Sequence, residues 1–499
     1  MDAVSWMPFW ILMSSVVPGV VIFFLSDQHK GLRTALNMGG VTVKLILIGF
    51  MVAGLIDGRT YLFRLPLLPG MDLVLQADTM SVLIAGLSGV LWFVTTVYAI
   101  AYLEDSPQPR SRFFGFFSLC VSATIGIALS GNLVTLLIFY ELLTLSTYPL
   151  VVHRGTPDSM RAGKIYIAYT LTGGALLLFG VAWLRSIVGP LTFVQGGILA
   201  DWPAAYHGVF KAIFFLMIAG LGVKAAIIPL HGWLPTAMVA PAPVSALLHA
   251  VAVVKAGAFG IVRVVYDVFG IEFASQLGLL TPLAAVAAAT IIYGSLRALS
   301  QDGLKKRLAF STVSQVSYIA LGAGILGPIA TIGGIVHLVH QGLMKITLFF
   351  CAGNLAETIG VHRVSEMNGV GRRMPWTMAA FTVGALGMIG VPPIAGFVSK
   401  WYLGTGSVAA GANWVIGVLA ASSLLNAMYF LPILHRAWFR EPTGEWARQA
   451  APLGLETHWM LLIPPVLTAL LALLAGLLAD APFSPLSWAT RIAEGEYLR

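Results

Sequence analysis

Residues 221–235 read LGVKAAIIPLHGWLP, which places a lysine close to a proline inside an apolar segment. Pro229 has no amide hydrogen to donate to the carbonyl of Ala225, so it should kink or break the helix that contains it. Lys224 comes about one turn before that point. Carbonyl groups that are freed at membrane depth are tolerated where they line water or packed protein. The stretch therefore predicts a broken helix that carries a buried lysine.

The composition around this stretch is that of a membrane protein. The chain has 499 residues, of which 58% are hydrophobic and 10% are charged, whereas a soluble domain carries about 25% charged residues. One membrane span requires about 20 apolar residues. The sequence therefore predicts an all-α polytopic membrane protein and excludes a soluble globular domain. Fourteen spans are expected, at approximately 4–25, 35–56, 79–102, 113–130, 132–152, 163–187, 209–230, 243–266, 278–299, 309–325, 328–353, 376–400, 408–434 and 459–479.

A second proline break is expected in GMIGVPPIAGFVSKWYL, residues 387–403, where Pro392 and Pro393 interrupt the twelfth span and Lys400 follows. Two broken helices that lie five spans apart, each with one lysine, suggest two related five-helix units; two unrelated proline kinks are the alternative. Broken helices at corresponding places point to the transport sites. The expected division is a three-helix segment at 1–112, five-helix proton-channel repeats at 113–270 and 271–440, and a C-terminal transmembrane helix with a tail at 441–499.

Basic residues predict the orientation of the spans, because cytoplasmic loops are enriched in lysine and arginine. Seventeen of them fall in loops after odd-numbered spans: Lys30, Arg33, Arg110, Arg112, Arg154, Arg161, Lys164, Arg297, Lys305, Lys306, Arg307, Arg363, Arg372, Arg373, Arg436, Arg440 and Arg448. The opposite loops hold six: Arg59, Arg64, Arg185, Arg263, Arg491 and Arg499. We therefore expect both termini to face outward. This topology accounts for the net charge of +8, which is then no indication of nucleic-acid binding.

The sequence contains no pattern for a cofactor or a metal ion. Cys120 and Cys351 lie far apart in apolar segments, with neither the spacing of a zinc site nor a disulfide framework. No phosphate-binding loop and no dinucleotide-binding glycine motif are present. We expect the chain to bind no nucleotide, flavin, iron–sulfur cluster or metal by itself.

Charged side chains inside the spans are the main functional signal. The lysines in the spans are Lys44, Lys211, Lys224, Lys255, Lys345 and Lys400. Glu141, in IFYELLTLSTYPL (138–150), is the only acidic residue deep in a span. A charge at the bilayer centre costs at least about 2.5–3.5 kcal/mol, and burial favours the neutral form of either group. Such groups can give and take protons, so a file of them joined by water predicts a proton path in which Glu141 and a lysine form a switchable ion pair.

Not every charge in a span is expected to be functional. Lys44 lies about 12 Å into its span at 1.5 Å per residue, so we expect its ammonium group to reach the cytoplasmic surface along its flexible side chain. Lys211 begins its span and is expected to be an interface anchor. The four deeper lysines are the candidates for function. A link between helices is the alternative role for Glu141, although an uncharged polar residue could supply such a link at lower cost.

Histidines accompany the deep lysines. In IVHLVHQGLMK (335–345), His337, His340 and Lys345 span about 140° of one helix face, which suits a central relay between the two halves. A structurally satisfied buried histidine pair is the alternative. In the eighth span, His249 and Lys255 point about 120° apart, so they need not touch.

These stretches resemble the antiporter-like subunits that are shared by respiratory complex I, membrane-bound hydrogenases and multisubunit Mrp-type cation/proton antiporters. The matching sequences are FYELLTLSTYPL, VKAAIIPLHGWLPTAMVAPAPVSALLHAVAVVKAGAFG, QDGLKKRLAFSTVSQVSYIALG, HQGLMKITLFF and GVPPIAGFVSKWYL, within residues 113–434. The resemblance implies two inverted five-helix repeats, each with a broken helix. It assigns the role of the family's glutamate to Glu141 and the key lysine roles to Lys224, Lys255 and Lys400.

Other positions match the family less uniformly. These are His249, His337, His340 and Lys345. The spacing from His340 to Lys345 is five residues, where many relatives have four. Within the family, the length and the number of spans are most similar to the D subunit of Mrp-type antiporters. The long C-terminal lateral helix of the largest complex I relative is absent from this sequence.

The resemblance implies a proton-translocating membrane subunit of a multisubunit Na⁺/proton or K⁺/proton antiporter in the bacterial cytoplasmic (inner) membrane. Glu141 would gate Lys224, and the charge state would pass through Lys255 and the histidines to Lys400. Other membrane subunits would supply the acidic residues for the cation, because this chain has one deep carboxylate and cations such as Na⁺ prefer oxygen ligands. The alternative is a proton-pumping subunit of a complex I-like NADH-quinone oxidoreductase or a membrane-bound hydrogenase, with the cofactors on partner chains. A purely structural scaffold does not explain the buried charges.

Overall fold

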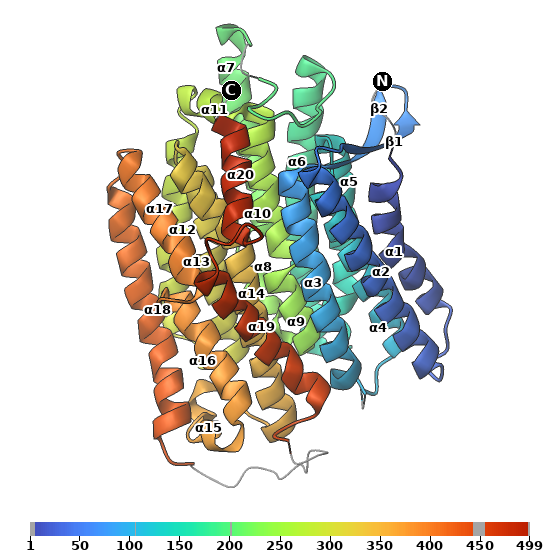
Figure 1. The fold of residues 1–499 in the computed structure, drawn as a ribbon, viewed down its shortest axis with the longest axis vertical. Coiled ribbons are helices and arrows are strands. Elements are labelled where there is room, and N and C mark those ends of the chain that lie inside the picture. The colour runs from blue at the N-terminus through green and yellow to red at the C-terminus, as the bar shows by residue number, and fades with distance from the viewer. Residues whose placement is uncertain (1–4, 105, 200–201, 443–454, 498–499) are drawn as a thin grey trace.

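The computed structural model describes residues 5–104, 106–199, 202–442 and 455–497. Figure 1 shows helices packed side by side, with both chain ends at the top of the view. We call this side the termini end of the bundle. The opposite side, which holds the arginine- and lysine-rich loops, is called the basic end. Two residues counted in the loop comparison, Arg448 and Arg499, lie outside the described residues, as does most of the predicted connection before the last span.

The N-terminal segment contains three helices and a β-hairpin. They are α1 (Met7–Phe23), α2 (Lys30–Ile56), β1 (Tyr61–Leu68), β2 (Met71–Ala77) and α3 (Thr79–Tyr102). The strands are antiparallel, with Tyr61 opposite Ala77, and the chain turns at Gly70, whose φ of 74° favours glycine. The sequence analysis did not predict this hairpin. A bridge from Leu75 to Ser130 ties it to the termini end of the next unit.

The first five-helix unit ends in two interrupted helices. It comprises α4 (Arg110–Ala128), α5 (Leu133–Val151), α6 (Pro157–Val188), η1 (Ala204–Tyr206), α7 (His207–Lys224), α8 (Trp233–Thr236), η2 (Ala237–Val239), α9 (Ala242–Ala250), α10 (Val253–Arg263) and the π-helical turn η3 (Val264–Phe269). The proline break predicted after Lys224 is confirmed, because α7 ends at that residue. Asn132 starts α5, where its side chain accepts a hydrogen bond from the amide of Thr135.

The second unit and the C-terminal helices complete the bundle. They are α11 (Ile271–Gln276), α12 (Leu280–Leu299), α13 (Leu304–Ala323), α14 (Pro328–Ile359), η4 (Val364–Glu366), α15 (Val370–Arg373), α16 (Pro375–Ile389), α17 (Ala395–Ala409), α18 (Trp414–Phe439), α19 (Trp459–Leu477) and α20 (Pro485–Tyr497). The second predicted break is confirmed between α16 and α17. α20 lies within the predicted tail, and it packs on α14 and α3 through Leu486, Ala489 and Ile492.

The two units have the same internal packing. α4 packs on α5 and α6 packs on α7, just as α12 packs on α13 and α14 packs on α17. Corresponding helices lie five spans apart, so they run through the bundle in opposite directions. α7 starts at the termini end in Figure 1, whereas α16 starts at the basic end. The structure thus contains the predicted inverted repeats.

The predicted spans account for the long helices. Eleven helices of the described residues are long and apolar enough to cross a membrane. The remaining three predicted spans correspond to α1, to α13 and to the broken pair α16–α17. α13 begins with LKKR, so its first turn is polar although the rest of the helix is buried. The multi-span prediction is confirmed.

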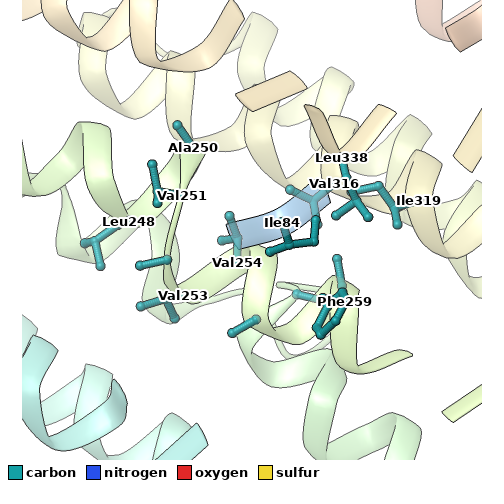
Figure 2. Close-up of a cluster of buried hydrophobic side chains, with 14 of the residues drawn as sticks. Ile84, Leu248, Ala250, Val251, Val253, Val254, Phe259, Val316, Ile319 and Leu338 are labelled. Carbon is teal, nitrogen blue, oxygen red and sulfur yellow. The ribbon is translucent and has the colours of Figure 1, made fainter. Parts of the chain in front are cut away.

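A break that the sequence did not predict separates α9 from α10 at Val251 and Ala252. Figure 2 shows this link surrounded by apolar side chains, with Ile84 of α3, Val316 of α13 and Leu338 of α14 close to it. The residues of the link are buried. The sequence predicted one continuous span at 243–266, because no proline marks this interruption.

Candidate functional site

The first helix break leaves carbonyl groups that are satisfied by aromatic side chains. The indole Nε1 of Trp233 donates a hydrogen bond to the carbonyl of Val223 over 2.7 Å. The hydroxyl of Tyr140 donates to the carbonyl of Gly220 over 2.9 Å. Both carbonyls belong to the last turn of α7, which has no further helical turn to supply partners. The break is therefore a packed structure with defined polar contacts.

Lys224 is the last residue of α7 and is completely buried. Its ammonium group donates a hydrogen bond to the carbonyl of Tyr140 and lies 3.3 Å from the centre of the Tyr140 ring. The carbonyl end of a helix favours a cation, and an aromatic face adds to that attraction. The position stabilises a positive charge without a bonded carboxylate.

Glu141 lies beside this ammonium group without pairing with it. The two side chains interact electrostatically, yet no ion pair within 4.0 Å joins them among the described residues. Oε1 of Glu141 is buried and has no hydrogen-bond partner in that part of the chain. The two charged groups are therefore neighbours that do not form an ion pair in this structure.

Gly174 of α6 provides the space for the Glu141 carboxylate. A Cβ atom at Gly174 would lie 2.0 Å from Oε1 and 2.6 Å from Cδ of Glu141. The atoms it would meet are the far end of a flexible side chain, so the carboxylate would have to move while the helices keep their places. Position 174 therefore sets the position of the carboxylate relative to Lys224.

We expect Gly174→Ala to lower proton flux by about tenfold or more, since a misplacement of about 1 Å at a reacting group can cost about 100-fold. Assembly and thermal stability should stay close to those of the parent protein. Proton flux in vesicles, normalised to the amount of assembled protein, measures the effect. Thr172→Ala, at an exposed position on the same helix, is the matched control. Equal flux in the two variants would show that the carboxylate position is unimportant.

Lys255 lies in the first turn of α10, directly after the α9–α10 break. We call the interior region around its side chain, between α10 and α14, the centre of the bundle. Its ammonium group donates to the carbonyl of Leu338 on α14 over 2.6 Å, and the side chain is buried. Gly257 brings α10 against the first break, because a Cβ there would lie 2.3 Å from the amide nitrogen of Ala225. The close approach of these two backbones joins the first break to the centre.

Two of the three histidines lie near Lys255. His337 forms a hydrogen bond through Nδ1 with the hydroxyl of Ser399 at 2.8 Å, and the His340 ring approaches the backbone of Ala395 without reaching hydrogen-bond geometry. His249 instead stacks on Phe349 of α14, with ring centres 4.4 Å apart. Phe349 lies about 18 Å along the helix from His337, so the predicted relay residues do not form one cluster.

Several buried polar atoms near the centre have no hydrogen-bond partner among the described residues. They are both ring nitrogens of His249 and His340, Nε2 of His337, both side-chain polar atoms of Gln315, and Oε1 of Gln341. Buried polar atoms in proteins are nearly always paired with protein or with water, and water in such places makes about three hydrogen bonds. These atoms are positions at which bound water would complete the hydrogen bonding.

Lys345 occupies a separate position on α14. Its ammonium group donates to the hydroxyl of Ser311 and, over 3.3 Å, to the carbonyl of Leu308, both on α13. At 1.5 Å per residue it lies about 12 Å along the helix from His337. The three polar residues of α14 therefore do not form one contact cluster, although Lys345 and His249 interact electrostatically.

A cavity of about 590 Å³ opens at the basic end below this centre. Its lining includes Tyr102 of α3 and Glu357 of α14. Tyr102 stacks on Tyr98 with ring centres 5.8 Å apart, and Tyr98 stacks on Phe350 at 4.4 Å. Phe350 follows the residue on which His249 stacks. These aromatic contacts link the cavity to the part of α14 against which His249 packs.

Lys400 lies on α17 but reaches back to the end of α16. Its ammonium group donates to the carbonyls of Met388 and Ile389 over 3.1 and 2.8 Å, and to the hydroxyl of Ser423 over 2.9 Å. Both broken helices thus hold an ammonium group at the carbonyl end of their first half-helix. Lys400 also lines a cavity of about 520 Å³ between α17 and α18. It is therefore more open than Lys224.

The two lysines expected to be structural have different surroundings. Lys211 is exposed near the start of α7. Lys44 is completely buried, so the prediction that it reaches the surface is wrong. Its ammonium group donates to the hydroxyl of Ser15 over 2.5 Å and lies 4.6 Å from the centre of the Trp92 ring. Polar and aromatic groups on α1 and α3, invisible from the sequence of α2, hold it inside the bundle.

Sequence reasoning missed the direct partners of the lysines and of His337. These partners are the Tyr140 carbonyl and ring, Ser311, Ser399 and Ser423. Tyr140 and Ser399 are direct neighbours of Glu141 and Lys400, which was the one available signal. Ser311 and Ser423 come from other helices and carry no sequence signal.

The sequence was compared with known families. Residues 130–426 match the family described as "NADH:quinone oxidoreductase/Mrp antiporter, TM". The chain belongs to this family. The N subunit of NADH-quinone oxidoreductase from Desulforudis audaxviator is 36% identical over 391 residues, which cover 76% of this chain and 77% of that one. The D subunit of the Na⁺/H⁺ antiporter from Alkalihalophilus pseudofirmus is 27% identical over 476 residues, covering 95% and 94%.

Chains of two solved complexes share the fold of this protein. A chain of the Mrp complex from Dietzia sp. superposes with a TM-score of 0.87 at 23% identity, covering 99% of this chain and 97% of that one. A chain of an archaeal membrane-bound sulfane sulfur reductase gives a TM-score of 0.86 at 23% identity, covering 98% and 97%. Both matches belong to membrane complexes. This chain is accordingly a multi-pass membrane protein with the architecture of an antiporter-like subunit.

Proposed function

We propose that this chain is the proton-translocating membrane subunit of a multisubunit Na⁺/proton or K⁺/proton antiporter. The observation that supports this proposal best is the pair of broken helices. In each of them an ammonium group lies at the carbonyl end of the first half-helix. Lys255, His337 and His340 lie between the two breaks, where unpartnered polar atoms offer places for water. A proton could therefore pass from one break to the other without leaving the bundle.

The chemistry begins with the unpaired charges of Glu141 and Lys224. When the carboxylate approaches the ammonium group, their attraction holds the proton on the lysine. When the two separate, as in this structure, the ammonium group keeps only the Tyr140 carbonyl and ring and gives up its proton more readily. A proton released there can reach Lys255 and then the histidines. At the far end, Lys400 exchanges it through the cavity between α17 and α18.

The lengths of the relatives support the antiporter. The antiporter D subunit from Alkalihalophilus pseudofirmus aligns over nearly the whole of both chains. The second candidate is a proton-pumping subunit of a complex I-like NADH-quinone oxidoreductase, which the higher identity to the N subunit of such an enzyme favours. The same proton path would serve an antiporter and a redox-driven pump. In the first the driving force is an ion gradient, and in the second it is a redox reaction on partner chains.

Measurements on the native complex distinguish the antiporter from the redox-driven pump. We would purify the complex gently, record its visible spectrum, and reconstitute it in vesicles with a pH-sensitive dye. An antiporter should move protons when a Na⁺ or K⁺ gradient is imposed, without any electron donor. Flavin or iron–sulfur absorbance, together with proton movement that requires an electron donor, would establish the redox pump and overturn the proposal. We also propose the bacterial cytoplasmic membrane as its location, with both termini outside.

The chain by itself should not exchange cations for protons at a substantial rate. Its deep groups are mostly lysines, which repel Na⁺ and K⁺, and Glu141 is a single carboxylate where cations prefer several oxygen ligands. We expect vesicles that contain this chain alone to show less than about a tenth of the exchange rate of the complex, because one carboxylate makes a poor oxygen site. The measurement is the dye response to a Na⁺ or K⁺ pulse. Robust exchange by the isolated chain would contradict this expectation.

A further inference from the structure

The N-terminal helices contain a buried charge that the proposed proton path does not use. Lys44 lies fourteen residues after the start of α2, about 21 Å along the helix at 1.5 Å per residue. It has no exposed surface, and no ion pair among the described residues includes it. A buried cation without a carboxylate carries a large desolvation cost. Such a position calls for a reason other than stability.

The surroundings of Lys44 are polar and incompletely bonded. Its ammonium group donates to the hydroxyl of Ser15 over 2.5 Å. The hydroxyl of Ser122 on α4 donates to the same Ser15 oxygen over 2.7 Å. The indole Nε1 of Trp92, whose ring lies under the ammonium group, is buried and has no hydrogen-bond partner in the described chain. A hydroxyl can both donate and accept, so Ser15 and Ser122 can hand a proton to the amine.

Polar groups continue from this site towards the basic end. Ser118 lies one turn from Ser122 on α4, and its hydroxyl donates to Oδ1 of Asn37 over 3.2 Å. The amide group of Asn37 donates to the carbonyl of Arg33 over 3.0 Å. Arg33 donates to the hydroxyl of Ser111 over 3.2 Å. Polar side chains therefore follow one another between α2 and α4 from the buried site to the surface. Ser122 is joined to Ser118 through the carbonyl of Ser118, to which its hydroxyl donates over 2.8 Å, and we call this row of polar groups the seam.

The surface end of the seam is a carboxylate. Oδ1 of Asp27 accepts a hydrogen bond from the amide of Ser111 over 2.7 Å, and its side chain is 41% exposed. Partial burial raises the pKa of Asp27, but the hydrogen bonds from Ser111 and the charge of Arg33 outweigh it and lower the pKa below its ordinary value. The ionised carboxylate of Asp27, at the surface end of the seam, attracts protons to it.

The opposite side of Lys44 is closed. Towards the termini end, its neighbours on α1 and α2 are Ile11, Leu12, Ile48 and Met51, all buried. Towards that end the hydroxyl of Ser15 donates to the carbonyl of Leu12 over 3.2 Å, and no side-chain hydrogen bond among the described residues continues from that carbonyl. The site is thus connected to one end of the bundle only, unlike a channel.

Charged neighbours are few on every helix around Lys44. α1 carries no acidic or basic residue and no histidine. α3 contributes two tyrosines, Tyr98 and Tyr102, which pack towards α14 and the basic-end cavity. α4 contributes two arginines in its first turn and Cys120, which faces Thr147 of α5. The charge of Lys44 is therefore not set by a fixed counter-ion.

We propose that Lys44 is a second proton-binding site, reached from the basic end through the Ser118–Ser122–Ser15 seam and closed towards the termini end. Ser15 passes its hydroxyl proton to the neutral Lys44 amine and takes the proton of the Ser122 hydroxyl. The proton that arrives from the basic end replaces the one that Ser122 gave up, so both serines are neutral again and the net change is one proton on Lys44. The site does not require the proposed function to be correct.

Thermal unfolding tests proton binding independently of transport. A site that titrates in the folded protein makes stability depend on pH. We would compare the parent protein with Lys44→Met in the purified complex, following a fluorescent tag on this chain between about pH 6 and pH 10, which spans the pKa values of buried and exposed lysines. The difference in melting temperature should drift by about 1 °C per pH unit where the site titrates. A constant difference would establish a fixed structural charge and overturn the proposal.

A second pair of variants covers the case in which Lys44→Met does not assemble. Ser15→Ala removes the hydroxyl that contacts Lys44, whereas Ser14→Ala removes a neighbouring hydroxyl that bonds to the carbonyl of Ile11. Ser15→Ala should shift the pH dependence of the melting temperature and Ser14→Ala should leave it unchanged. Identical profiles for the two would overturn the proposal.

Vesicles that hold the complex in one known orientation test from which end of the bundle protons reach Lys44. The transport rate of Ser15→Ala relative to the parent should change when pH is varied on the side of the basic end, and stay constant when pH is varied on the other side. A response to the side of the termini end would contradict the closed arrangement. A complex with no transport of any kind would count against the proposed function alone, because the unfolding measurements would still report the site.

Discussion

Lys400→Arg is expected to stop proton transport as completely as Lys400→Ala does. A residue that ends a proton path must exist with and without its proton, and arginine keeps its charge under almost all conditions. The Lys400 ammonium group also fits between the carbonyls of Met388 and Ile389 and the hydroxyl of Ser423. Both variants should fall below roughly a tenth of the parent flux in vesicles, because neither can cycle between two charge states.

The opposite outcome has a clear meaning. If Lys400 only stabilises the carbonyl end of α16, arginine should preserve much of the activity, because a helix terminus responds to charge rather than to proton exchange. Lys211→Arg is the matched control, since Lys211 is exposed near the start of α7. It should transport at the parent rate. An active Lys400→Arg variant would remove Lys400 from the proton path.

Glu141→Gln and Lys224→Met should each reduce proton flux to the background rate while the complex still assembles. Each change keeps the approximate shape of the side chain and removes one member of the switch. In the glutamine variant the ammonium group loses the charge that would hold its proton. In the methionine variant the carboxylate, already without a partner at Oε1 among the described residues, has no ammonium group to approach. Flux normalised to assembled complex is the measurement.

The double variant separates a shared mechanism from two independent lesions. Residues that act as a unit show strong non-additivity. Glu141→Gln combined with Lys224→Met should therefore lose no more activity than either single variant, and it should be slightly more stable than Lys224→Met because no unpaired, partly buried carboxylate remains. Near-parent flux in either single variant would refute the switch.

Sequence patterns predicted the features that depend on local chemistry. Pro229 and the pair Pro392–Pro393 break their helices because proline lacks an amide hydrogen wherever it stands. Glu141 and the deep lysines were visible because few charges occur in spans.

Features that depend on contacts between distant segments were missed. The α9–α10 break has no proline, and it forms where Gly257 lets α10 approach Ala225 of another helix. The burial of Lys44 depends on Ser15 and Trp92, which belong to α1 and α3. The β-hairpin at the termini end was also not predicted. Its two strands are adjacent in sequence, whereas its bridge to Ser130 joins distant segments.

The opposite directions of the two broken helices have an electrical consequence. α7 runs inward from the termini end to Lys224, and α16 runs inward from the basic end to the carbonyls that hold Lys400. The dipoles of the two half-helices therefore point in opposite directions across the membrane. A potential of 100 mV does about 2.3 kcal/mol of work on a unit charge that crosses the whole membrane. On the proposed path one proton charge crosses in each turn, so turnover should be sensitive to voltage even when the pH is equal on both sides.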